Sequence, residues 1–169
     1  MLQLGKAGAH GSGKGVLPLL ADGAVVATLQ ASNWKEQAIA VIGGREWVFS
    51  KRKGELTARW VADPEDAARL RARQTPFWKG TWAAELDGTA VEVETLSHWK
   101  GTHRYLAGGQ EVARSDSTGG LSPQPTLEVA PQVPLEHQVF LLWLELVVRG
   151  RSGDGSVFGG SDGGGGGGD

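Results

Sequence analysis

Apolar and polar residues alternate along most of the chain, which is the pattern of half-buried β-strands. In the stretch TAVEVET, Val91 and Val93 fall on one face and Glu92 and Glu94 on the other. Such stretches are separated by Gly-Gly and Asp-Gly dipeptides, which two-residue hairpins prefer. The pattern predicts strands over residues 2–5, 15–20, 24–31, 36–42, 45–51, 55–61, 68–74, 80–86, 89–95, 101–106, 110–115 and 125–129.

A repeated frame runs through these strands. The segments GKGVLPLLADG, WKEQAIAVIGG, WKGTWAAELDG and WKGTHRYLAGG begin at Gly13, Trp34, Trp78 and Trp99, and each has lysine second and glycine last. The second pair of segments follows the first by 65 residues (78 − 13 and 99 − 34). Residues 13–61 align with 78–126 without a gap, with 14 identities in 49 positions. We interpret the chain as two duplicated six-stranded halves, about 1–62 and 66–130.

The stretch GAHGSGKG, Gly8–Gly15, matches the front of a phosphate-binding P-loop. The magnesium-binding Ser or Thr that should follow Lys14 is absent, and Pro18 stands where the required helix would begin. The residues VLPLL followed by Asp22-Gly23 fit a strand and a hairpin turn. We therefore expect the start of a hairpin here and no nucleotide site.

The junction between the halves is less regular. Asp63 and Pro64 suit the cap and the first position of a helix. We predict one short turn there, followed by a strand in which Leu70 alternates with arginines; the alternative is a helix from Pro64 through Arg73.

The segment PLEHQVFLLWLELVVRG, Pro134–Gly150, predicts a helix that is apolar on nearly its whole circumference. At sixteen residues, 134–149, it is shorter than the roughly 20 residues that a bilayer requires, so we expect it to be buried in protein. Glu145 and Arg149 are four residues apart and predict an ion pair near an exposed end. Residues 151–169, mostly glycine, predict a disordered tail after one domain over 1–150.

Twelve strands and one apolar helix can be combined in a barrel with the helix inside it. A closed barrel of this size has a lumen too wide for its own side chains, and a helix along the axis would fill it. We predict a mainly β fold, namely a closed twelve-stranded antiparallel barrel with a buried C-terminal helix.

The chain resembles the tubby C-terminal-like superfamily over residues 1 to about 150. The resemblance rests on the number of strands, on the duplication and on the apolar helix VFLLWLELVV. This superfamily includes the LURP-one-related and phospholipid-scramblase-like barrels. Two segments of the chain are also similar to small bacterial proteins of this barrel type, namely ARLRARQTPFWKGTWAAELDG and HQVFLLWLELVV. The resemblance implies a twelve-stranded barrel around a C-terminal helix. It also implies contact between basic surface residues and anionic lipid head groups.

Composition narrows the function classes. The net charge of −2 argues against a strongly basic nucleic-acid binder, so no nucleic-acid partner is expected. The absence of cysteine excludes disulfides and a thiol nucleophile and suits the cytoplasm. The first ten residues lack the apolar run of a signal peptide.

No catalytic constellation stands out, so we expect no enzyme, cofactor or metal. His98 and His103 flank WKGT, and Glu92 or Glu94 would lie nearby, but the spacing fits no metal-binding pattern.

Recurrent tryptophans and turn glycines predict structural roles, with ligand stacking as the alternative for the tryptophans. The predicted structural residues are Trp34, Trp78, Trp99, Gly44, Gly88, Gly109, Phe140 and Trp143.

One basic cluster is evident, and we predict that it contacts anionic lipid. It combines a hairpin loop with an outer barrel face, and comprises Lys51, Arg52, Lys53, Arg69, Arg71 and Arg73. Two functions follow as hypotheses. The first is a non-enzymatic binding or interaction module, with anionic lipid or another protein as partner, located in the cytoplasm or peripherally at the membrane. The alternative is a scramblase-like protein whose C-terminal helix leaves the barrel and inserts into the bilayer.

Overall fold

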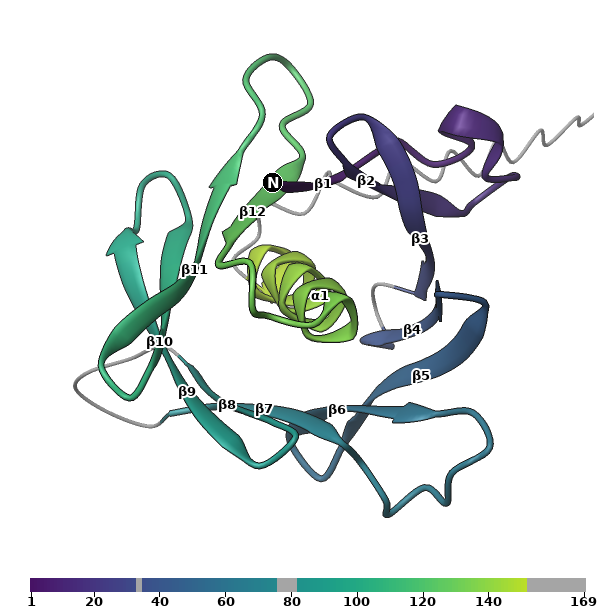
Figure 1. The fold of residues 1–169 in the computed structure, drawn as a ribbon. Helices are drawn as coiled ribbons and strands as arrows, with labels where there is room; N and C mark the ends of the chain where they lie inside the picture. Colours follow the sequence, from purple (N-terminus) through teal and green to yellow (C-terminus); the bar gives the residue numbers. More distant parts are fainter. Residues whose placement is uncertain (33–34, 76–81, 152–169) are drawn as a thin grey trace, which may run out of the picture.

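The computed structural model describes residues 1–32, 35–75 and 82–151, which form a closed antiparallel barrel around one helix, as predicted (Figure 1). The strands are β1 (Leu2–Leu4), β2 (Leu17–Ala21), β3 (Ala24–Ser32), β4 (Gln37–Ile42), β5 (Arg45–Arg52), β6 (Glu55–Trp60), β7 (Leu70–Gln74), β8 (Trp82–Leu86), β9 (Thr89–Ser97), β10 (Thr102–Ala107), β11 (Gln110–Ser117) and β12 (Pro125–Val129). A short 3-10 helix, η1 (Ala9–Gly11), precedes β2, and α1 spans Leu135–Arg151.

Each strand pairs with its neighbours in the chain, and β1 closes the barrel against β12. Leu2 lies opposite Leu127 and Gln3 opposite Thr126 in this closing pair. Closure pairs both edges of every strand, so the barrel offers no free edge for aggregation.

Tight turns join many of the strands at one end of the barrel. Asp22 and Gly23 have φ angles of 49° and 82°, and Asp87 and Gly88 have 48° and 84°. Positive φ at both central residues is the geometry of type I′ turns, whose twist matches the flanking strands. Gly44 and Gly109 likewise end turns with positive φ, as their predicted structural role requires.

The 65-residue offset in the sequence is also an offset in structure. Shifting β2, β3, β4 and β5 by 65 gives the bounds of β8, β9, β10 and β11 residue for residue (for example 24 + 65 = 89 and 32 + 65 = 97). The correspondence ends at β6, because residues 55–60 would map to 120–125 whereas β12 is Pro125–Val129.

Small inward side chains leave room for α1 along the axis. Seven alanines are buried on six of the strands, namely Ala27, Ala38, Ala40, Ala58, Ala72, Ala84 and Ala113. The helix fills the space with large residues, and Phe140 and Trp143 pack on Phe49 with ring centroids 5.7 and 5.2 Å apart. Both helix residues are buried, in agreement with their predicted structural roles.

The helix extends two residues beyond its predicted end at Arg149. Gly150 does not adopt a left-handed conformation, so it does not stop the helix. Arg151, assigned from the sequence to a disordered tail, is helical and donates hydrogen bonds of 2.6 and 2.8 Å to Glu36. The remainder of the predicted tail lies outside the described residues. No helix of the described part is long and apolar enough to cross a membrane.

The junction before β7 contains a turn rather than the alternative helix. The amide of Ala67 donates to the carbonyl of Pro64 at 3.0 Å, and the strand begins at Leu70, two residues later than predicted. Leu70 and Ala72 face the core while Arg71 and Arg73 alternate with them, as predicted.

Candidate functional site

The predicted basic cluster does not form a single uniform patch. Three of its six members are neutralised by carboxylates. Ion pairs join Lys51 to Glu36 (3.3 Å), Arg69 to Asp63 (3.0 Å) and Arg71 to Glu55 (3.4 Å). The guanidinium of Arg69 also lies over the ring of Trp60, 3.9 Å from its centroid. Arg69 therefore packs against Trp60 in addition to pairing with Asp63.

The other three cations remain exposed. Arg52 and Lys53 occupy the β5–β6 hairpin, Arg73 lies near the end of the neighbouring β7, and none has an ion-pair partner within the described segments. A surface hollow of about 320 Å³ lies beside them and is lined by Arg52, Lys53, Arg71, Glu55, Thr57, Glu65, Asp66 and Ala68. The carboxylates in this lining offset part of the positive potential, so the hairpin tip is the least neutralised part.

The one buried ionic cluster of the described barrel interior was missed by the sequence analysis. Glu145, in the middle of α1, is 0% exposed, and both of its carboxylate oxygens lie 3.1 Å from Nδ1 of His103. The hydroxyl of Tyr105 donates to the same carboxylate. His103 and Tyr105 are two residues apart on β10, so the pleat directs both toward the helix.

Burial governs the electrostatics of this cluster. Removal from water, reinforced by the nearby Glu145 carboxylate, raises the pKa of Tyr105 well above its ordinary value of 10.0. Tyr105 therefore stays protonated and acts as a hydrogen-bond donor. All three residues are buried, so the cluster has the character of a structural anchor for α1.

The predicted ion pair of Glu145 with Arg149 is wrong. Glu145 faces β10, and Arg149 instead donates to the backbone carbonyl of Asp116 at 3.1 Å. The four-residue spacing made the pair sterically reasonable, but Glu145 lies on the side of the helix that faces the barrel wall. Side chains alternate between the two faces of β10, which places His103 and Tyr105 on the same face. This alternation was a weak sequence signal for the partners of Glu145.

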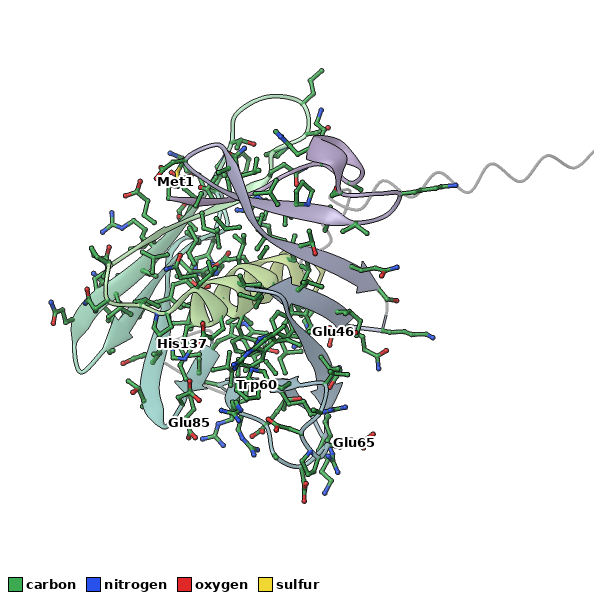
Figure 2. The ribbon with its side chains drawn as sticks, turned by 45° about the vertical axis from the view of Figure 1, so that its right-hand side comes forward. Met1, Glu46, Trp60, Glu65, Glu85 and His137 are labelled. Carbon is green, nitrogen blue, oxygen red and sulfur yellow. The ribbon has the colours of Figure 1, made fainter. Side chains whose placement is uncertain are left out.

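A second histidine–carboxylate contact lies at the start of α1. Nε2 of His137 is 2.7 Å from the Asp87 carboxylate in the β8–β9 turn, and Figure 2 shows His137 on the side of the barrel where Glu85 lies. This contact ties the beginning of the helix to one end of the barrel.

Among residues 1–32, 35–75 and 82–151, no group of three or more His, Cys, Asp and Glu side chains has the arrangement of a metal site. His98 is exposed at a loop while His103 is buried, so the two histidines that flank WKGT do not converge.

Of the tryptophans that begin the repeated segments, the structure describes Trp99. Trp99 is 95% exposed, which contradicts its predicted packing role, because the β9–β10 connection holds it away from the barrel wall. Trp34 and Trp78 lie outside the described residues. Trp47, Trp82 and Trp143 are buried in the core instead.

The stretch GAHGSGKG is a loop between β1 and β2. Gly8, Gly11, Gly13 and Gly15 all have positive φ, and a strand follows where a P-loop needs a helix. The expectation of a hairpin start is therefore confirmed, with the β2–β3 turn at Asp22-Gly23.

Strand direction places all the described lysines at one end of the barrel. Because consecutive strands are antiparallel, the connections β1–β2, β3–β4, β5–β6, β9–β10 and β11–β12 share an end, and the even-numbered strands finish at the opposite end. The lysines of the first set of connections, or of the strand ends beside them, are Lys6, Lys14, Lys35, Lys51, Lys53 and Lys100. We call this face the lysine end.

The opposite end carries carboxylates. Its turns include Asp22, Asp63 and Asp87, and its connection to α1 is followed by Glu136. Two of these carboxylates have basic partners, because Asp63 pairs with Arg69 and Asp87 contacts His137.

Comparisons of the chain with models of known protein families, with curated proteins and with solved structures gave no match.

Proposed function

We propose that this barrel is a non-enzymatic binding module that contacts an anionic lipid surface. The observation that carries the proposal is the exposure of Arg52 and Lys53 at the tip of the β5–β6 hairpin, without ion-pair partners in the part of the chain that the structure describes. Basic side chains near an anionic bilayer contribute about 1 kcal/mol each, and a few of them suffice for reversible attachment.

The buried cluster supports a non-enzymatic role. Glu145, His103 and Tyr105 carry the chemistry of an acid–base site, but their side chains are buried between α1 and the barrel wall. A substrate would have to displace the helix to reach them.

The same cluster argues against the alternative in which α1 leaves the barrel and inserts into a membrane. Insertion would break the contacts of Glu145 and move a carboxylate toward hydrocarbon, at a cost of about 2.5–3.5 kcal/mol or more. It would also empty a lumen lined by alanines.

Vesicle flotation tests the lipid contact. The protein is mixed with phosphatidylcholine vesicles, with and without phosphatidylserine, at low and at high salt. We expect flotation only with phosphatidylserine, and less at high salt because the exposed charges are screened.

A double substitution, Arg52→Glu with Lys53→Asp, should abolish flotation. Asp suits the position of Lys53, whose φ is 51°, and Lys51 keeps its pair with Glu36. Arg114→Glu, on the exposed surface of β11, is the control for charge reversal elsewhere. Flotation of the wild-type protein that does not depend on phosphatidylserine, or no flotation at all, would refute the proposal.

A further inference from the structure

The lysine end presents exposed apolar side chains together with its positive charge. Trp99, in the β9–β10 connection, is 95% exposed, and Leu121, in the β11–β12 connection, is fully exposed. Both connections belong to the same end as the lysines. A tryptophan and a leucine projecting from separate loops beside lysines match the composition that membrane interfaces select.

The cations at this end are available to a partner. Lys6, Lys14, Lys53 and Lys100 are exposed and form no ion pair within the described residues. Lysine, a compact and strongly hydrated charge on a long flexible stem, suits diffuse attraction to phosphates better than it suits bidentate recognition.

A hollow of about 490 Å³ lies between the β1–β2 and β11–β12 connections of the same end. Lys6, His10 and Leu121 contribute to its lining, as does Gln124, whose side-chain oxygen is buried without a hydrogen-bond partner in the described structure. The hollow therefore combines positive charge and an apolar side chain with a nearby unsatisfied acceptor.

We infer that the described connections of the lysine end form the membrane-contacting face. The barrel axis then stands nearly perpendicular to the bilayer plane, and Trp99 and Leu121 insert at the level of the head groups. This inference rests on the proposed function and extends it, because it enlarges the contact from the β5–β6 hairpin to the other described connections of the same end. The acidic turns of the opposite end then point away from the anionic surface.

The orientation is tested with environment-sensitive probes. The chain contains no cysteine, so single substitutions Leu121→Cys and Val61→Cys each give one attachment point for a fluorophore. Val61 is 52% exposed and belongs to the β6–β7 connection at the opposite end. With phosphatidylserine vesicles we expect a blue shift and a gain in intensity from the probe at position 121, and neither change from the probe at 61.

Substitutions test the energetics of the same face. Trp99→Ala should lower vesicle partitioning roughly ten-fold, because it removes a large interfacial side chain, whereas Val61→Ala should leave it unchanged. Lys14→Gln and Lys100→Gln should each lower it about five-fold. Arg45→Gln, at the opposite end, is their control.

The outcomes separate the two proposals. Vesicle binding with an unchanged probe at 121, or with a shifted probe at 61, would overturn the orientation and leave the lipid function standing. Absence of vesicle binding would overturn both. Lysine-dependent binding of single-stranded DNA in place of vesicles would also overturn both, and would assign the same end to stacking of bases on Trp99.

Discussion

The carboxylate of Glu145 determines how α1 sits in the barrel, because it is the charged side chain of the helix that is fully removed from water. A buried carboxylate is tolerated only when donors surround it. Tyr105 and His103 supply those contacts from one strand, so the helix cannot rotate or slide without leaving the charge unsatisfied.

Loss of one donor should therefore destabilise the fold. We expect Tyr105→Phe to lower the free energy of unfolding by about 1–3 kcal/mol, the penalty for leaving a buried polar group short of a hydrogen bond. Urea unfolding followed by circular dichroism measures it, with Glu92→Gln on the exposed face of β9 as a control that should change little. An unchanged midpoint for Tyr105→Phe would show that His103 alone satisfies the carboxylate.

The raised pKa of Tyr105 predicts alkaline behaviour. A phenol whose pKa is higher in the folded than in the unfolded state stabilises the fold fully below its ordinary value of 10.0, and this contribution is lost as the pH rises above that value. Tyr105 is the one tyrosine of the chain, so tyrosinate absorbance reports it alone. We expect that absorbance to rise together with unfolding. Ionisation of Tyr105 near pH 10 in a barrel that is still folded would contradict the burial of its side chain.

At the scale of single residues, the sequence predicted which side chains face inward but not which polar groups meet. Alternation places Val91, Val93 and Leu70 in the core, as the structure does. Glu145 and His103 are 42 residues apart, and only closure of the barrel around the helix brings them together. The exposure of Trp99 was missed because recurrence at a hairpin entry was interpreted as a packing role, whereas the β9–β10 connection holds this side chain away from the barrel wall.

At the scale of elements, the end of α1 depends on tertiary contacts rather than on its own stop signals. Arg149 and Arg151 lie in the last turn, where positive charge is favourable at the carboxyl end of a helix, and each contacts a strand or loop of the lysine end. Gly150 therefore remains helical. The strands, by contrast, were predictable to within a few residues, because turns with positive φ at both central residues fix where β3, β5, β6, β9 and β11 begin.

The pair of Arg151 with Glu36 should make the end of the helix sensitive to acid. Hydrogen bonds from Arg151 lower the pKa of Glu36 from 4.5, so the pair stabilises the fold above that value and loses its contribution as the pH falls below it. We expect the protection of the 147–151 amides, measured as their exchange rate relative to the intrinsic rate at each pH, to fall below about pH 4.5 in the wild type and to be low already at neutral pH in Arg151→Gln.

A matched variant separates this pair from a general effect of removing positive charge. Arg45→Gln removes an arginine that stacks on Trp60 instead of pairing with Glu36. Exchange at 147–151 should be the same in Arg45→Gln as in the wild type. If Arg151→Gln also exchanges like the wild type, the end of the helix is held by packing alone.

At the scale of the whole molecule, barrel and helix share one hydrophobic core. Neither half of the duplication has a core of its own, because its inward alanines face α1 rather than the other half. The sequence predicted this arrangement from the width of the lumen and the all-round apolar helix. The gathering of lysines at one end was implicit in the repeated lysine, but it became visible only when strand direction was assigned.

A chain that ends at Ala130 should therefore fail to fold, whereas a chain that ends at Arg151 should unfold in one cooperative urea transition. Without α1, the wall loses contact with Phe140 and Trp143, and twelve strands would enclose a space that their alanines cannot fill. Adding a peptide of residues 131–151 to the shorter chain should restore near-ultraviolet circular dichroism, because the Glu145 contacts with β10 would then fix its position. A cooperative transition in the shorter chain alone would contradict this prediction, because it would show that the twelve strands form a stable structure without α1.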